Sequence, residues 1–153
     1  MEQLIISGVI TVAIIGFVVW KQMRAKPIRD GLKLPLIVLI IGAYVGYHAI
    51  VSGAIHWQMW QWILWLGLFI LSAGVLSVAR AWTYRLWFDV EQAQIMQQGT
   101  WVTLVLWAMS FGLVILRGDF LPHADQLSYL MIGTLLLVQT ICTNWRAQRA
   151  FNL

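Results

Sequence analysis

The chain has 153 residues, of which 61% are hydrophobic and only 10% are charged, and ten residues are tryptophan. This composition does not fit a water-facing surface, so lipid is the expected solvent. The net charge of +4 comes from basic residues that flank apolar segments, which favours anionic lipid headgroups over nucleic acid as the partner. The single cysteine excludes an intramolecular disulfide and a two-thiol redox pair.

The first apolar segment, residues 4–20, contains no charged residue and is long enough to cross a bilayer when its flanks are included. Glu2 precedes the segment, and basic residues follow it at positions 21, 24, 26, 29 and 33. A secretory signal has the opposite order of charges. We therefore expect a retained transmembrane helix with its N-terminus outside.

Two further apolar segments, residues 34–55 and 57–79, predict a pair of helices joined by a tight turn. Pro35 suits a first helical turn because it has no amide proton to leave unsatisfied. Gly42 and Gly46 lie four residues apart on one face of the first helix of this pair. Small residues at this spacing predict close packing against another helix.

Residues 80–99 mix aromatic, β-branched and polar residues without helical periodicity. We interpret them as a β-hairpin, with strands at 83–88 and 93–97 and a turn at 89–92. Leu86 and Phe88 would occupy one face, and Arg85 and Trp87 the other. A short interfacial helix is the alternative, because residues 91–98 are good helix formers and no glycine supplies the turn.

The last two apolar segments, residues 100–116 and 126–142, predict the fourth and fifth membrane spans. Between them lies a polar segment, 117–125, in which Gly118 and Pro122 should interrupt any helix. Residues 144–153 form a short tail that carries Arg146 and Arg149.

Lysine and arginine are distributed very unevenly over the two sides of these five spans. One side holds positions 21, 24, 26, 29, 33, 80, 85, 146 and 149, and the other holds Arg117 alone. The positive-inside rule places the basic side in the cytoplasm. The sequence therefore predicts one all-α membrane domain over 1–153, with five transmembrane helices, the N-terminus outside, the C-terminus cytoplasmic and a cytoplasmic hairpin at 80–99.

Two stretches of the chain resemble a known family. Residues 19–29 read VWKQMRAKPIR and are followed by LPL at 34–36, while residues 80–107 contain TYRLW at 83–87, Gly99 and Trp107. Together they resemble the CcdC-like family of small bacterial multispanning membrane proteins, whose function is uncharacterised. The resemblance implies a bacterial cytoplasmic membrane protein, with a strand, turn and strand in the second stretch, and it implies no reaction.

A candidate ligand site is centred on His48, because an ionisable side chain within a span is a functional candidate. Tyr44 lies on the same helical face, and a cavity would also draw on Tyr47 and Thr103. The alternative is a neutral imidazole hydrogen-bonded to a tyrosine or to nearby backbone. A metal site would use the residues expected outside, which are His48, His56, His123, Asp119 and Asp125, but their spacing matches no metal motif.

We find no catalytic set, because the spans contain no Asp, Glu or Lys and their serines have no GxSxG context. The leading hypothesis is a non-enzymatic accessory or scaffold protein without a cofactor. It would bind a partner protein, with a homo-oligomer or a larger membrane protein as candidates, through the basic loop 21–33 and the hairpin. The hairpin residues expected to carry that contact are Arg85, Trp87, Asp89 and Glu91. A small transporter or ligand-binding protein, and a haem or redox partner in cytochrome maturation, are the alternatives.

Overall fold

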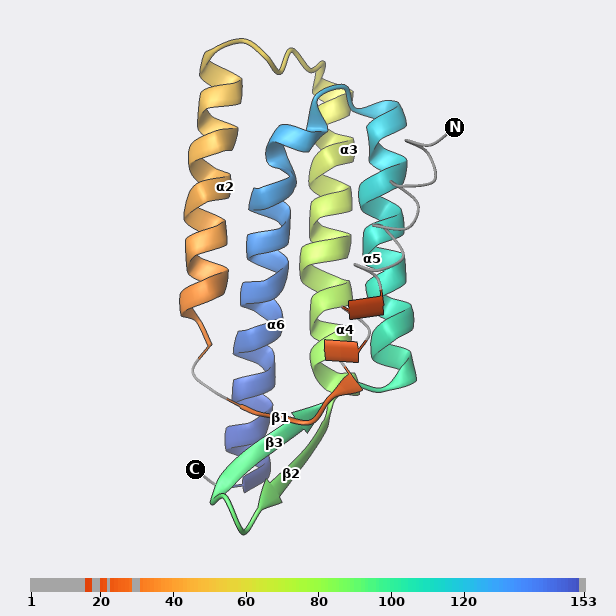
Figure 1. Cartoon of the computed structure of the whole chain (residues 1–153). Coiled ribbons are helices and arrows are strands. Elements are labelled where there is room, and N and C mark those ends of the chain that lie inside the picture. Colours follow the sequence, from red (N-terminus) through yellow and green to blue (C-terminus); the bar gives the residue numbers. More distant parts are fainter. Residues whose placement is uncertain (1–15, 18–19, 22, 29–30, 152–153) are drawn as a thin grey trace, which may run out of the picture.

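The structure is a computed structural model that describes residues 16–17, 20–21, 23–28 and 31–151, and only the backbone of 114–119. Most of the predicted first span, 4–20, lies outside these residues. The described chain is mostly helical, with a small three-stranded sheet. The helices run side by side as a bundle, and the sheet lies across one end of it, near the C-terminus (Figure 1). We call this end, where the strands β1, β2 and β3 lie, the sheet end.

Helix α2, Lys33–Val51, starts at the sheet end and carries Pro35 in its first turn. It ends at Val51 and not at the predicted residue 55, because the chain turns at Gly53, whose φ is +73°. A positive φ is strained for other residues but not for glycine, which makes this the natural position for the turn.

The next helical rod has three parts: α3, Met59–Phe69; the π-helical segment η1, Ile70–Val75; and α4, Leu76–Thr83. Gln58 and Gln61 form a reciprocal capping box at its start. The rod runs past the predicted end at residue 79 as far as Thr83. Helix α3 has no buried residue, whereas α4 buries Leu76, Ser77, Arg80 and Ala81.

Helix α5, Trp101–Phe120, continues through Arg117 and Gly118, where the sequence predicts a loop. Glycine inside a helix costs only about 1 kcal/mol relative to alanine, so Gly118 alone does not end it. The chain turns instead around Pro122, and a short 3₁₀ segment, η2, Ala124–Leu127, leads into α6, Ser128–Phe151.

Helix α6 also continues beyond its predicted end at residue 142, so the expected tail is helical. Ala147, in this last part, is buried, and the ring of Phe151 lies 6.4 Å from the ring of Phe88 in the sheet. Contact with the sheet therefore gives the polar C-terminal turns of α6 a folded environment that their sequence does not indicate.

Three helical segments of the described chain are long and apolar enough to cross a membrane, namely Lys33–Val51, Met59–Thr83 and Ala124–Phe151. A shorter apolar stretch, Trp101–Leu113, lies in α5. This length and composition agree with a membrane protein.

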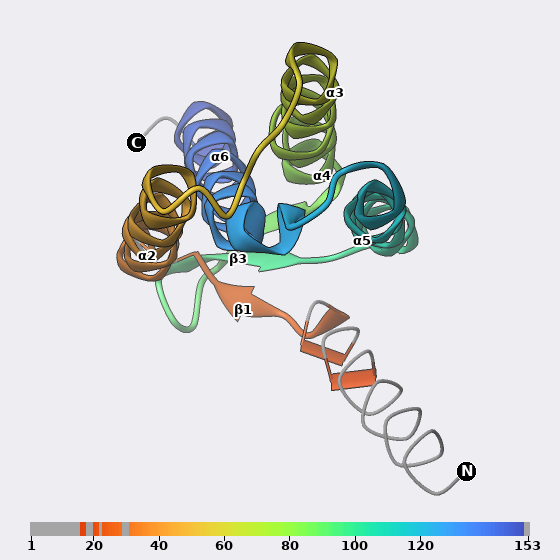
Figure 2. The same ribbon diagram turned by 90° about the horizontal axis from the view of Figure 1, so that it is seen from above.

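Helices α2 and α6 approach each other very closely at two glycines, Gly42 of α2 and Gly133 of α6. A Cβ atom on Gly42 would lie 2.5 Å from the Cα of Leu130, and one on Gly133 would lie 2.6 Å from the Cα of Leu39. A third glycine, Gly46 of α2, faces η2 instead, where a Cβ would meet the side chain of Leu127 at 2.8 Å. The two helices are neighbours in the end-on view of Figure 2. Both helices thus supply glycine where their backbones touch.

The predicted hairpin is present as β2, Arg85–Asp89, paired antiparallel with β3, Gln94–Gln98, so the interfacial-helix alternative is wrong. The turn is shifted by one residue, to 90–93, and Ala93 takes the left-handed conformation with φ +49°. A third strand, β1, Lys26–Pro27, pairs antiparallel with β3, which gives the order β1-β3-β2. The basic loop and the hairpin therefore share one sheet.

Candidate functional site

Arg80 lies inside the bundle at the sheet end and is completely buried. Its guanidinium stacks over the ring of Trp107, 4.1 Å from the ring centroid, and its Nη2 donates to Ser77 Oγ at 2.9 Å. Ser77 Oγ in turn donates to the carbonyl of Ser72 at 3.1 Å. Within the part of the chain that the structure describes, Arg80 Nε and Nη1 have no hydrogen-bond partner. A buried cation with unused donors favours a nearby anion or water.

Tyr84 follows directly after α4 and is also buried. Its hydroxyl oxygen accepts a hydrogen bond from Gln139 Nε2 of α6 at 2.8 Å. Burial raises the pKa of the Tyr84 phenol, while the charge of Arg80 and the bond from Gln139 act in the opposite direction. The phenol is therefore protonated at neutral pH and lies within the electrostatic reach of Arg80.

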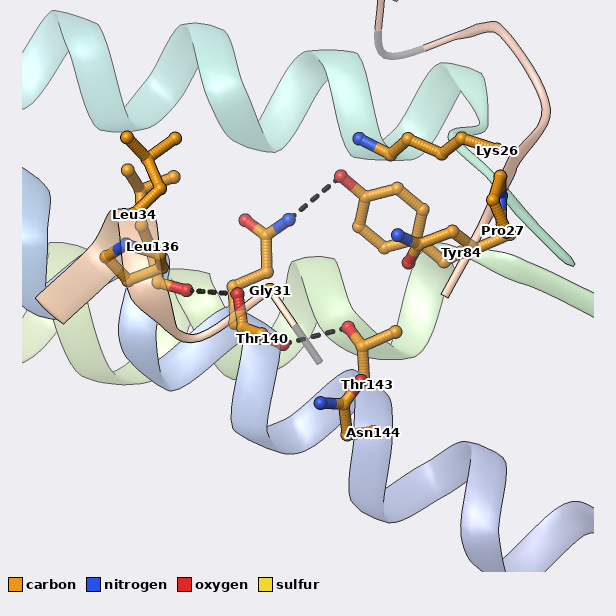
Figure 3. Close-up of a pocket in the computed structure, with 12 residues that line it drawn as sticks. Lys26, Pro27, Gly31, Leu34, Tyr84, Leu136, Thr140, Thr143 and Asn144 are labelled. Atoms are coloured by element: carbon orange, nitrogen blue, oxygen red, sulfur yellow. Dashed lines mark hydrogen bonds between the residues drawn. The ribbon is translucent and has the colours of Figure 1, made fainter. Parts of the chain in front are cut away.

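A pocket of about 270 Å³ opens beside Tyr84, and we call it the interfacial pocket. It lies between the start of α2, the C-terminal half of α6 and the sheet (Figure 3). Its polar lining includes Lys26, Tyr84, Gln97, Gln139 and Asn144. The remaining lining residues are Pro27, Gly31, Leu34, Pro35, Leu136, Thr140 and Thr143.

Lys26 is the cation that lines the interfacial pocket, and its side chain extends toward the Tyr84 ring in Figure 3. Burial lowers the pKa of the Lys26 amine, and the nearby charge of Lys21 lowers it further. In strand register Lys26 lies opposite Gln97, which places their side chains on the same face of the sheet.

Arg146 joins the end of α4 to α6. Its Nη1 lies 2.9 Å from each of the carbonyl oxygens of Ala81, Trp82 and Tyr84. These carbonyls lie at the C-terminal end of α4, where the helix leaves acceptors unsatisfied and a positive charge is stabilising. Arg146 thus fixes the position of Tyr84 and of the strand that follows it.

Thr103, one of the predicted ligand residues, lies in this same region and is fully buried. Its hydroxyl lies 2.8 Å from the hydroxyl of Thr83 and accepts a hydrogen bond from the backbone N–H of Thr100 at 3.0 Å. Thr103 therefore links the end of α4 to the start of α5.

The other predicted ligand residues lie on an exposed face of α2, where Tyr44 and Tyr47 are 65% and 64% exposed. The ring of His48 meets the ring of Tyr44 edge-on, with centroids 4.7 Å apart. The structure brings these three side chains together but does not bring Thr103 to them. The histidine ring thus has an aromatic neighbour on its own helix.

The hairpin residues have separate environments. Arg85 and Glu91 are exposed, and Trp87 is half-buried. Asp89 Oδ1 accepts hydrogen bonds from the backbone N–H groups of Glu91 at 3.0 Å and Gln92 at 3.4 Å. Asp89 is therefore a turn residue, since such bonds stabilise a tight turn without glycine.

No family model matches the chain, and no curated protein or solved structure matches it either. In the ranges that the structure describes, no three His, Cys, Asp or Glu side chains are grouped as metal ligands. The sequence places Lys26 only in the basic loop and gives no sign of a pocket that it shares with Gln97 and Asn144, because these residues come from segments that only the fold brings together.

Proposed function

We propose that the chain is a non-enzymatic accessory protein of the bacterial cytoplasmic membrane that binds a partner protein through its sheet end. The observation that carries this proposal is the shared sheet, in which Lys26 and Pro27 of the basic loop pair with the hairpin strand β3. The two cytoplasmic segments with the strongest sequence case for partner binding thus form one surface.

The outer edge of this surface supports the proposal. Strand β2 ends the order β1-β3-β2, so no described strand covers its second edge, and such an edge is a ready template for another chain. Phe88 is 47% exposed and Val90 at the turn is 82% exposed, next to the charges of Arg85 and Glu91. Exposed apolar side chains beside charges are typical of binding surfaces.

The orientation that we propose has five spans, with the N-terminus outside and the sheet end in the cytoplasm. Its support is the distribution of charge, because Lys33, Arg80, Arg85 and Arg146 all belong to the sheet end, while Arg117 belongs to the opposite end of α5 (Figure 1). A reporter that is active only in the cytoplasm should be active after residue 153 or within 89–92 and silent near residue 119. Activity near 119 would refute the five-span arrangement.

We further propose membership of the CcdC-like family, on the residues 19–29, 34–36 and 80–107 quoted above. The resemblance supports the bacterial cytoplasmic membrane as the location and does not identify the partner. Oligomerisation with a second copy and docking to a larger membrane protein are both compatible with an exposed strand edge.

Site-specific photocrosslinking in intact cells tests the proposed function. A photoreactive residue in place of Val90 should give a discrete protein adduct, whereas the same residue in place of Ile40, which is 67% exposed on α2, should not give that adduct. Arg85→Glu should remove the adduct without changing the amount of inserted protein, because isolated surface charges usually alter stability by less than about 0.5 kcal/mol.

The mass of the adduct distinguishes a second copy from a different protein. An adduct that forms equally from Val90 and Ile40 would contradict a partner site on the hairpin. Persistence of the Val90 adduct in both Arg85→Glu and Phe88→Ala, each of which should remove it, would contradict the site as well.

A further inference from the structure

The interfacial pocket is large, and the charged side chain in its described lining is a cation. Its volume of about 270 Å³ is several times the roughly 30 Å³ that one water molecule occupies in the liquid. Lys26 lines it, and no Asp or Glu is among the described residues that do so. Asp30, the carboxylate nearest to the pocket in sequence, lies outside the described residues. A cation facing such a pocket favours an anionic ligand.

Hydrogen-bond donors surround the same space. Helix α2 begins there with no side-chain cap and no acidic residue in its first turn. Pro35 has no N–H and that of Leu36 bonds to the Leu32 carbonyl, so the N–H groups of this turn that can favour an anion, together with the helix dipole, are those of Lys33 and Leu34. The amides of Gln97 and Asn144 also line the pocket. The hydroxyls of Thr140 and Thr143 donate to α6 carbonyls at 2.8 Å and are thereby already used. The donors therefore come from the sheet, from α2 and from Asn144.

Arg80 is a second positive charge, which is linked to the pocket through Tyr84. It is completely buried, and no carboxylate among the described residues pairs with it. Tyr84, which interacts electrostatically with Arg80, forms part of the pocket lining. An anion in the pocket would thus face Lys26, and the charge of Arg80 would act on it past Tyr84.

The apolar part of the lining indicates the source of the anion. Leu34, Pro35 and Leu136 line the pocket on the side of the helices, and Leu34 is 64% exposed. A polar group at the sheet end, joined to an apolar part along the helices, matches a phospholipid whose phosphate lies at the membrane boundary. Free phosphate would use only the polar half of the pocket.

We propose that the interfacial pocket binds the phosphate of an anionic phospholipid, with Lys26, Asn144 and the start of α2 as its ligands. This assigns a defined lipid site, beyond general attraction of the basic loop to headgroups. It does not depend on the partner-binding role of the hairpin.

Native mass spectrometry of the full chain in detergent tests the proposal, with phosphatidylglycerol as the probe. We expect saturable binding of one phosphatidylglycerol, and no such binding of diacylglycerol with the same acyl chains, because diacylglycerol lacks the phosphate. Lys26→Gln should weaken binding about tenfold, the effect of losing one charge-assisted hydrogen bond. Asn144→Asp should weaken it as well, because it adds a negative charge to the pocket.

Arg24→Gln is the matched control, since Arg24 is an exposed cation of the same basic loop that does not line the pocket. It should change the affinity by less than about twofold. A loss in Arg24→Gln equal to that in Lys26→Gln would overturn the proposal in favour of general surface attraction. Equal binding of diacylglycerol would overturn it without any variant, so a variant that fails to fold does not block the test.

Competition separates the two sources of phosphate. A large excess of inorganic phosphate should leave bound phosphatidylglycerol in place, because the ion lacks the contacts with Leu34 and Leu136. Displacement by inorganic phosphate in the wild-type protein would overturn the lipid assignment and make the pocket a site for the free ion.

Discussion

Replacing Gly42 by alanine tests whether backbone contact between α2 and α6 holds the bundle together. The added Cβ would lie 2.5 Å from the Cα of Leu130 and equally close to the carbonyl carbon of Tyr129. Ordinary van der Waals contact begins near 3.4 Å, and backbone atoms cannot rotate out of the way as a side chain can. The two helices must therefore move apart by about 1 Å at this point.

The cost of this movement exceeds the intrinsic gain from alanine. Overpacking costs about 1–3 kcal/mol, and a contact with rigid backbone belongs at the upper end of that range. The higher helix propensity of alanine raises the free energy of unfolding by about 1 kcal/mol. We expect Gly42→Ala to lower the free energy of unfolding by about 1–2 kcal/mol.

Gly67→Ala in α3 is the matched control, because a Cβ there would have no described atom within 4 Å. Only the propensity gain applies, so this variant should be stabilised by up to about 1 kcal/mol. Thermal unfolding in detergent, followed by tryptophan fluorescence, should separate the two variants by about 5–10 °C. Equal melting temperatures would refute the inference that α2 and α6 touch through their backbones.

Three further predictions concern the sheet end. Arg146→Ala should lower the free energy of unfolding by about 2 kcal/mol, because its guanidinium bonds to three carbonyls at the end of α4. Arg149→Ala should change it by less than about 1 kcal/mol, because the Arg149 guanidinium stacks on an exposed indole. Denaturation in detergent measures both variants, and equal losses of stability would contradict a stabilising role of Arg146 at the end of α4. Ala93→Gly should stabilise the protein by about 0.5–1 kcal/mol, because a φ of +49° is strained for alanine and not for glycine. An unchanged melting temperature would contradict backbone strain at Ala93. Burial lowers the pKa of Lys26, so its charged form destabilises the fold at neutral pH, and this penalty fades as the pH rises toward 10.5, the pKa of lysine in the unfolded chain. Without lipid, Lys26→Gln should therefore have a higher melting temperature than wild type at pH 7, and the difference should shrink at alkaline pH. A difference in melting temperature that does not change with pH would contradict this argument.

The hairpin is the part of the fold that the sequence predicts best. Leu86 and Phe88 alternate with Arg85 and Trp87 along the observed strand, but burial does not follow this period, because Leu86 and Trp87 are half-buried while Arg85 and Phe88 are exposed. The turn was placed one residue early because Ala93 carries the positive φ, and alanine gives no signal for that conformation.

Strand β1 and the end of α6 could not be predicted, because both depend on contacts far along the chain. Lys26 and Pro27 become a strand only through pairing with Gln97 and Met96, and two residues that include a proline show no strand pattern. Ala147 is buried against elements that come much earlier in sequence, so the helix around it carries little local hydrophobic signal.

The candidate site was harder to predict than the fold. The sequence indicates Arg80 only as one of the basic residues that flank the spans, whereas it is fully buried and stacked on Trp107. Ser77, one helical turn earlier, is a polar neighbour on the same face, and this spacing was the available signal. The interfacial pocket has no such signal, because its residues come from the basic loop, from Tyr84 at the end of α4, from β3 and from helices α2 and α6.

The π-helical segment Ile70–Val75 determines which way the end of the rod faces. A π turn holds one more residue than an α turn, so everything after it is rotated by about 100° relative to an uninterrupted helix. Beyond this offset, α4 directs Ser77 and Arg80 into the bundle, whereas α3 before it has no buried residue. Loss of a single residue between 70 and 75 would keep the rod apolar and helical yet turn the guanidinium outward. An insertion or deletion of one residue in this turn would therefore change the direction of the Arg80 side chain, whereas the same change in a surface loop would not.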